Sequence, residues 1–164
     1  MDFKIKKLKY NNSDLCFSFI KNEPYFKKFK NLNGWSKKSI ESFLKSKNSL
    51  AYGCYNSNNL IGFIFCNNFV FAKTSEIELL LIFVQKTYRR LEIGKSLINF
   101  ILKKQNKQNL INIYLEFSES NIIAKYFYEN CGFINISVRK DYYVLSNGFK
   151  ENAKSYKKTI KKIF

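Results

Sequence analysis

The sequence contains no histidine, and this absence excludes several kinds of catalytic and metal site. A Ser-His or Cys-His nucleophile depends on an imidazole base, and many metal sites depend on an imidazole ligand. Any proton transfer in this chain must therefore use carboxylates, tyrosines, lysines or thiols. We expect no metal site.

Long apolar runs are also absent, since the longest, Leu79–Val84, is far too short to cross a membrane. Residues 1–10 contain lysines but lack the apolar segment of a secretory signal. The four cysteines are Cys16, Cys54, Cys66 and Cys131. None belongs to a C-x-x-C pair, and their apolar neighbours favour buried free thiols over disulfides or a zinc site. Free thiols indicate a reducing compartment, so we predict a cytoplasmic protein.

Acidic residues are few: the chain has 12 Asp+Glu and 29 Lys+Arg, which gives a net charge of +17 at pH 7. Arginine is scarce too, at Arg89, Arg90 and Arg139 alone. A dedicated nucleic-acid reader normally carries more arginine, which makes bidentate contacts to phosphates and bases. Abundant Asn, Ile, Phe and Tyr instead favour a compositional bias towards A/T-rich codons. Nucleic-acid binding through the lysine-rich surface is the less favoured alternative.

The remaining composition, 46% hydrophobic and 18% aromatic, is sufficient for the core of one domain spanning residues 1–164. Alternating patterns predict strands at Phe3–Lys9, Leu50–Tyr55, Leu60–Cys66, Phe69–Ala72, Glu76–Val84, Leu110–Phe117, Ile134–Tyr143 and Ala153–Ile160. Helical spacing predicts helices after the cap-like run Asn11–Asp14, after the cap Ser36, at Ile93–Lys104 and at Ser120–Asn130. This order predicts an α+β fold, a mixed central β-sheet flanked by helices.

Arginine, lysine and glycine gather between a buried strand and an amphipathic helix, at Arg89–Lys95. Such a turn presents backbone N–H groups and the positive end of a helix to an anion, and is a natural phosphate cradle. The alternative is a solvated turn that needs its glycine only to bend.

A carboxylate and two tyrosines follow in the next strand and helix. Glu116 ends a strand between Leu115 and Phe117, and partial desolvation there would make it a stronger base. The alternative is an exposed charge at a strand end. Tyr126 and Tyr128 lie on a helix headed by Ser120-Asn121, where capping and packing are the simpler interpretations.

Several segments together resemble the GCN5-related N-acetyltransferase (GNAT) family, and in particular its RimI-like branch of ribosomal-protein-alanine N-acetyltransferases. They are Gly34-Trp35-Ser36, Ile113–Phe117, Ser120-Asn121, Tyr126–Phe133, Val138–Tyr143 and Asn147-Gly148. The resemblance extends from about Phe3 to Ile160, and it is specific in the second half of the chain and loose in the first.

The resemblance implies a single N-acetyltransferase domain that uses acetyl-coenzyme A as co-substrate. It implies Glu116 as the base that deprotonates the amine and Tyr128 as the acid that protonates the departing thiolate. It assigns coenzyme binding to Ile82, Phe83, Val84, Arg89, Arg90, Leu91, Glu92, Ile93, Gly94, Lys95 and Asn121. Within this set the strand Ile82–Val84 would pair with the pantetheine arm, and the loop Arg90–Lys95 would hold the pyrophosphate.

The implied acceptor is a protein N-terminus, most directly the N-terminal alanine of a small-subunit ribosomal protein. Two alternatives stay open: acetylation of a small-molecule amine or an internal lysine, and a degenerate basic module that binds the ribosome or RNA. The chain departs from the family pattern where Glu92 replaces the first motif glycine, Leu81 a polar residue and Val144 a proline. Glu78 is a second candidate for the base, because other branches use a carboxylate on this strand.

Overall fold

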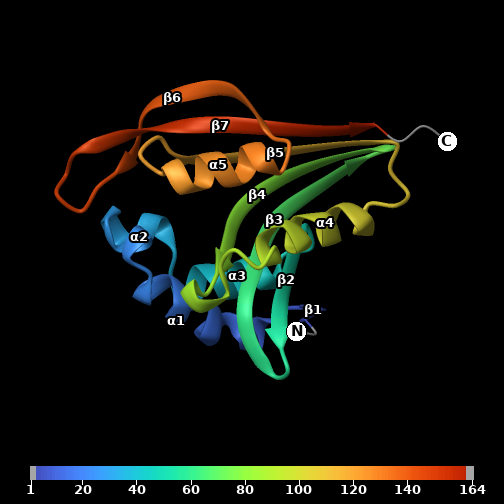
Figure 1. Ribbon diagram of the computed structural model, residues 1–164, viewed down its shortest axis with the longest axis horizontal. Helices are drawn as coiled ribbons and strands as arrows, with labels where there is room; N and C mark the ends of the chain where they lie inside the picture. The colour runs from blue at the N-terminus through green and yellow to red at the C-terminus, as the bar shows by residue number, and fades with distance from the viewer. Residues whose placement is uncertain (1–2, 162–164) are drawn as a thin grey trace.

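The computed structural model describes residues 3–161, so residues 1–2 and 162–164 of the domain predicted over 1–164 lie outside the described part. Seven strands form one mixed sheet in the order β1-β2-β3-β4-β5-β7-β6 (Figure 1). The strands are β1 (Phe3–Lys7), β2 (Ser49–Asn56), β3 (Asn59–Phe71), β4 (Thr74–Val84), β5 (Leu110–Ser118), β6 (Ile134–Val144) and β7 (Lys150–Lys161). Only β4 and β5 pair in parallel among these strands.

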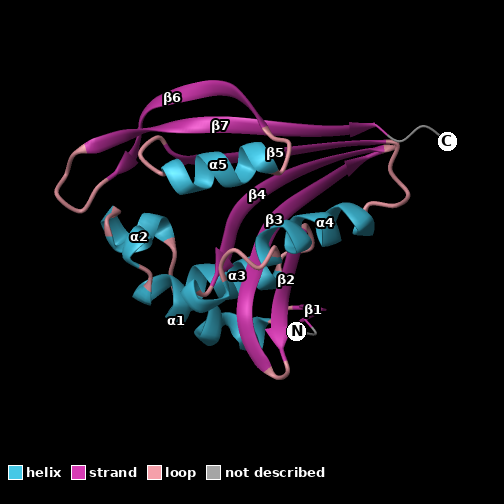
Figure 2. Cartoon of the chain, viewed as in Figure 1, coloured by secondary structure: helices cyan, strands magenta, loops and turns pink. Residues whose placement is uncertain are grey.

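Five α-helices and short 3-10 turns pack on this sheet (Figure 2). The helices are α1 (Ser13–Asn22), α2 (Pro24–Lys27), α3 (Lys37–Lys45), α4 (Ile93–Lys104) and α5 (Ile122–Asn130). The 3-10 turns are η1 (Tyr10–Asn12), η2 (Lys30–Gly34) and η3 (Lys86–Tyr88). The predicted α+β class with a mixed sheet is therefore confirmed.

Two apolar clusters occupy the two faces of the sheet, as the alternation of side chains along a strand requires. On β3, Phe63 and Phe65 pack in the cluster that includes α1, α2 and α3. Ile64 and Cys66, the residues between and after them, pack in the cluster that includes α4 and α5. The sheet is thus covered on both faces, and all four cysteines are buried and unpaired in the two clusters.

The parallel pair β4–β5 separates halfway along its length. Its register runs from Thr74 opposite Leu110 to Leu79 opposite Leu115, and there the pairing ends. Beyond this point β4 continues to Val84 alongside β3 while β5 continues alongside β7, and Figure 1 shows the two strands diverging. An irregularity in the β3–β4 register at Phe65/Cys66 bends β4 at the same level. The sheet therefore has an open strand edge in its interior.

Strongly periodic elements agree with their predictions. The α4 bounds coincide with the predicted Ile93–Lys104, and Ser36 caps α3 by accepting from the Ser39 N–H at 3.0 Å. Three predictions are wrong in detail. The strand β3 runs unbroken through the two predicted strands Leu60–Cys66 and Phe69–Ala72. The elements α2 and η2 occupy a stretch without a predicted element, and α5 begins at Ile122 instead of Ser120. No helix within residues 3–161 combines the length and apolarity needed to span a membrane.

Candidate active site

Glu116 lies on β5 one residue beyond the last β4–β5 pair, on the polar side of the strand. Its carboxylate accepts a hydrogen bond from Ser155 Oγ at 2.9 Å, and Ser155 is its cross-strand neighbour on β7. Arg139 Nη1 lies 3.0 Å from Oε2 and 3.2 Å from Oε1. The expected desolvation by Leu115 and Phe117 is wrong, because both side chains pack in the core on the opposite face. Glu116 instead occupies a polar, partly exposed position.

Tyr128 lies on α5 and is buried among aromatic rings. Its ring centroid is 5.6 Å from Phe117, 5.1 Å from Phe127 and 5.6 Å from Phe133. This burial raises the pKa of Tyr128 well above its ordinary value, and the nearby Tyr25 hydroxyl adds to the shift. Tyr128 therefore keeps its proton at neutral pH, as a group that later donates the proton must.

Tyr143 is a third tyrosine near the site, and its ring packs 5.1 Å from Phe29. It is buried at the end of β6, and burial is the first cause that raises its pKa. Neighbouring Tyr25, Tyr142 and Glu116 contribute to the same shift. Phe117, the residue after Glu116 on β5, stacks its ring on Tyr128 at 5.6 Å.

Tyr25 and Phe29 lie in the α2 region, by which we mean α2 and the two residues after it, residues 24–29. They form the other side of this site and were not singled out in the sequence. The Tyr25 and Phe29 rings pack edge to face at 5.2 Å, and Phe29 lies 5.1 Å from the Tyr143 ring. Burial raises the pKa of Tyr25, while hydrogen bonds with the Asn121 side chain and the Ser118 backbone oppose the shift. The signal available was the density of aromatic residues beside Pro24, in a stretch without periodicity.

The open edge of β4 carries two of the three residues predicted to contact pantetheine. Gln85 N–H donates to the Ile61 carbonyl at 2.9 Å, so the adjacent pair Gly62–Val84 is of the non-hydrogen-bonded kind. By alternation, Ile82 and Val84 direct their backbone groups away from β3, towards the side where β5 has diverged. The Val84 carbonyl already accepts from Arg89 Nε at 2.9 Å. Phe83 differs, because its ring stacks in the α1 cluster, 5.4 Å from Phe19.

The loop before α4 has two residues in the left-handed backbone conformation. Arg90 and Glu92 have φ values of 65° and 58°, in the left-handed region that glycine adopts most readily. The Glu92 carboxylate is largely exposed and pairs with Lys95 at 3.2 Å. At Gly94 an added Cβ would lie 2.8 Å from the Phe127 ring, so glycine permits the close approach of α4 and α5. Ile93 is buried beneath this turn.

Two further predicted residues have structural partners. The Arg89 guanidinium forms an ion pair with Glu23 at 2.7 Å and so joins this loop to the end of α1. The Asn121 side chain is the N-cap of α5, since its Oδ1 accepts from the Ala124 N–H at 3.0 Å. Leu91, by contrast, is exposed.

The second candidate base, Glu78, lies on the same face as Glu116 but further along the sheet. It is opposite Tyr114 in the β4–β5 register and accepts a hydrogen bond from Asn67 at 3.1 Å. Its side chain is exposed. Within residues 3–161 no group of three Cys, Asp or Glu side chains could hold a metal ion.

The fold is an α+β domain whose mixed sheet has an unpaired strand edge between β4 and β5. Residues 15–133, more than half of the chain, match the family described as the Acetyltransferase (GNAT) family. The chain therefore belongs to the GNAT family.

Comparisons with individual proteins agree with this assignment. The chain is 32% identical over 97 residues to the ribosomal protein bS18-alanine N-acetyltransferase of Haemophilus influenzae, which is 59% of this chain and 63% of that protein. It thus spans less than two thirds of the length of the curated relatives it matches. The crystal structure of the S18-alanine N-acetyltransferase from Escherichia coli is similar over 99% of this chain and 97% of its own, with a TM-score of 0.80 and 21% identity. Arabidopsis thaliana NAA60 in complex with acetyl-CoA is similar over 97% and 99%, with a TM-score of 0.81 and 14% identity.

Proposed function

We propose that this protein is an acetyl-coenzyme A-dependent N-acetyltransferase that acetylates a protein N-terminal α-amine, with the N-terminal alanine of a small-subunit ribosomal protein as acceptor. The observation that carries the proposal is the separation of β4 from β5 just before Glu116, in a chain that belongs to the GNAT family. Relatives that match part of the chain are alanine N-acetyltransferases of ribosomal protein bS18, which supports this acceptor. A ribosomal acceptor and four unpaired thiols favour a cytoplasmic location.

The residues around the point where β4 and β5 separate fit acetyl-coenzyme A. The backbone of Ile82 points into the open side of the sheet and can pair with an extended amide chain. The N-terminus of α4 presents free N–H groups and a positive dipole end, and Arg90 and Lys95 add positive charge beside it. Glu92 is turned to solvent and paired with Lys95, so it does not fill the position of the motif glycine with an unpaired negative charge. When bound, acetyl-coenzyme A supplies the acetyl group as a thioester.

The chain's own groups supply the two proton transfers. A free α-amine has a pKa near ~8, against ~10.4 for a lysine amine, so an N-terminal acceptor needs only modest help from a base. The Glu116 carboxylate, held by Ser155 and Arg139, accepts the proton of the acceptor ammonium, directly or through a water. Tyr128 keeps its proton in an apolar environment. It donates this proton to the thiolate that departs from the thioester when the amine has attacked the acetyl carbonyl.

The test is turnover of an Ala-initiated peptide with acetyl-coenzyme A, with mass spectrometry to locate the acetyl group. Glu116→Gln and Tyr128→Phe should each lower kcat by about 100-fold, the scale of a lost acid or base, while calorimetry still detects coenzyme binding. Tyr126→Phe is the matched control, because Tyr126 lies on the same helix and is exposed. Full activity in both catalytic variants, or a large loss in Glu78→Gln alone, would refute the assignment of roles.

The acceptor is tested by competition. Equal concentrations of the Ala-initiated peptide, a peptide with a blocked N-terminus and an internal lysine, and a polyamine are offered together. Acetylation of the α-amine should predominate. Turnover of the lysine or the polyamine alone would contradict an N-terminal acceptor while leaving the acetyl-coenzyme A chemistry in place.

A further inference from the structure

The charges of the chain are unevenly placed, and five lysines gather at the end of the sheet away from Glu116. Residues 42–75, 93–115 and 152–161 contain no aspartate or glutamate. Parts of these three segments meet where β3 and β7 end and β4 and β5 begin, at the right of Figure 1. The exposed lysines there, which we call the lysine patch, are Lys73, Lys103, Lys104, Lys107 and Lys161.

Backbone pairing brings the lysine patch together. The Lys73 carbonyl accepts from the N–H groups of Asn109 and Leu110 at 2.8 and 3.2 Å, so the turn between β3 and β4 contacts the loop between α4 and β5. Lys107 lies in that same loop. Leu110 is in turn opposite Lys161 in the β5–β7 register. The backbones of Lys73 and Lys161 are therefore separated by about two strand spacings, roughly 10 Å.

The helix α4 separates the lysine patch from the loop that is predicted to hold the coenzyme. Lys103 and Lys104 are the last two residues of the helix, where cations suit the negative end of its dipole. The Gln105 side chain accepts from Ser75 Oγ at 3.3 Å and so attaches this end of α4 to β4. A helix of 12 residues is about 18 Å long. The lysine patch and the loop Arg89–Lys95 are therefore two separate basic surfaces.

Exposed apolar side chains border the lysine patch. Phe71, the last residue of β3, is 63% exposed, and Val70 before it is 52% exposed. The next carboxylate along β4 is Glu76, and its Oε1 accepts from Asn112 Nδ2 at 2.7 Å. Because Ile77 packs in the cluster that includes α4, Glu76 lies on the opposite face of the sheet. An exposed ring beside lysines combines stacking with phosphate contacts, as surfaces that bind single-stranded nucleic acid do.

We propose that the lysine patch binds single-stranded RNA through its phosphates, without reading the base sequence. Charge complementarity carries the proposal, because the three segments that form the patch contribute five exposed cations and no carboxylate. The patch contains no arginine, and bidentate contacts to base edges are therefore not available to it. The scarcity of arginine speaks against a sequence-specific reader and is compatible with a surface that contacts phosphates alone. An acidic protein segment would pair with the lysines but would leave the Phe71 ring without a stacking partner.

The test is the binding of a fluorescein-labelled oligouridylate of about 12 nucleotides to the full chain, measured by anisotropy at several salt concentrations. The patch variant carries Lys73→Gln, Lys107→Gln and Lys161→Gln. The matched control removes the same charge from exposed lysines elsewhere, through Lys4→Gln, Lys7→Gln and Lys38→Gln. The patch variant should bind at least about 10-fold more weakly and lower the slope of log Kd against log salt by about 2, since each phosphate contact to a single strand contributes about 0.7. The control should bind like the wild type.

Three results would overturn the inference. They are no binding of the oligouridylate by the wild type, wild-type binding by the patch variant, and equal losses in the patch variant and the control. The last result would mean that the net charge of the chain, and not the lysine patch, attracts the RNA.

Further measurements test the chemistry and the place of binding. Arginine in place of Lys73, Lys107 and Lys161 should preserve binding, because it keeps the charge. Phe71→Ala should weaken binding by about 10-fold through the loss of one stacked base. Poly-glutamate at equal charge should displace the RNA poorly, and efficient displacement would assign the patch to an acidic protein segment and overturn the inference. Coenzyme A should not displace the RNA, because displacement would place it on the loop Arg89–Lys95. None of these measurements requires acetylation of a peptide, so their outcome is independent of the proposed function.

Discussion

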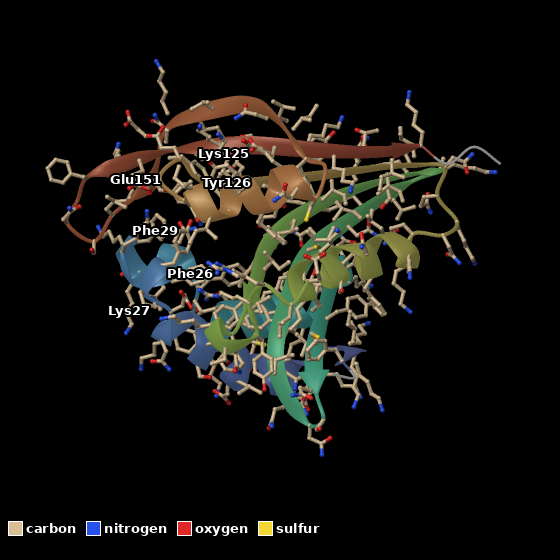
Figure 3. The ribbon with its side chains drawn as sticks, viewed as in Figure 1. Phe26, Lys27, Phe29, Lys125, Tyr126 and Glu151 are labelled. Atoms are coloured by element: carbon tan, nitrogen blue, oxygen red, sulfur yellow. The ribbon has the colours of Figure 1, made fainter. Side chains whose placement is uncertain are left out.

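Replacing Lys28 with methionine should destabilise the protein by about 2 kcal/mol, because Lys28 joins the α2 region to β7. Lys28 Nζ lies 3.0 Å from Glu151 Oε2 and 2.7 Å from Ser120 Oγ, and 4.8 Å from the centre of the Phe29 ring. Figure 3 shows Phe29 and Glu151, far apart in the sequence, on neighbouring segments beside α5. Phe29 in turn contacts Tyr143, so the same link supports one wall of the site.

The expected magnitude follows from the exposure of the two side chains. Lys28 is 32% exposed and Glu151 20%, so the pair lies between surface pairs, worth about 0–1 kcal/mol, and buried pairs, whose disruption costs about 3–5 kcal/mol. Glu151→Gln should cost about 1–2 kcal/mol, because the amide oxygen can still accept from Ser118 and Ser120. The double variant should cost about 1 kcal/mol less than the sum of the two, which is the coupling between the side chains.

The stability difference should also depend on pH. Burial alone raises the pKa of Glu151, but hydrogen bonds from Ser118, Lys28 and Ser120 outweigh it and hold the pKa below the ordinary value of 4.5. A lowered native pKa stabilises the fold above the unfolded value, and that stabilisation is lost as the pH falls through the native value. The difference between the wild type and Glu151→Gln should therefore be full at pH 7 and shrink below about pH 4.5.

The assay is urea unfolding followed by the fluorescence of Trp35, the single tryptophan, which lies at the end of η2 and 5.8 Å from the Phe65 ring. Lys27→Met is the matched control, because Lys27 is exposed and adjacent. A loss below about 0.5 kcal/mol in Lys28→Met, equal to that of the control, would mean that solvent screens the pair and would refute the reasoning. KM for the peptide should rise in Lys28→Met and not in the control.

Three other substitutions or reagents probe separate features. Gly62→Ala would place a Cβ 2.8 Å from the Phe83 carbonyl, so it should cost about 1–3 kcal/mol in thermal unfolding and raise KM for acetyl-coenzyme A by displacing the β4 edge. Glu92→Gly should relieve a left-handed backbone conformation and stabilise the protein by about 1 kcal/mol. Calorimetry should also show tighter coenzyme binding, and weaker binding would contradict the expectation that a glycine suits this position better. Burial raises the pKa of the Cys16 thiol to about 12, so a thiol reagent at pH 8 should leave Cys16 unlabelled until urea is added.

The sequence analysis succeeded where a local pattern determines the structure. The α4 helix follows from helical spacing, and the Ser36 cap follows from its position before the first periodic residue. It failed at residues 24–34, because this segment is held by contacts that span the chain, such as Lys28–Glu151, and not by its own periodicity. Asn31, Leu32 and Asn33 all have positive φ there; asparagine tolerates this conformation, but leucine rarely adopts it, so the run was not foreseeable from the sequence.

The candidate site was predictable in its members but not in its surroundings. Glu116 and Tyr128 came from the family motif, and their roles stay a prediction. The ion pair of Glu116 with Arg139 depends on the register of β6 with β7, which shifts between Asn135 and Ser137 and then pairs Arg139 with Ala153. Register and bulges are set by the packing of a whole sheet, so the sequence led us to expect an apolar neighbourhood for Glu116 where the fold provides a cationic one.

Because the protein is strongly basic, the removal of a carboxylate and the removal of a lysine should change its stability differently. With 29 basic and 12 acidic residues, the removal of a lysine lowers the repulsion among the positive charges, which partly offsets the contact that is lost. The removal of a carboxylate raises that repulsion and adds to the loss. The same holds for Glu23, Glu116 and Glu151, each of which pairs with a cation on a distant segment around the site. Since repulsion between exposed charges is screened within about 10 Å at 0.1 M salt, Glu151→Gln should cost more at low salt than at high salt, and Lys28→Met should show the weaker dependence.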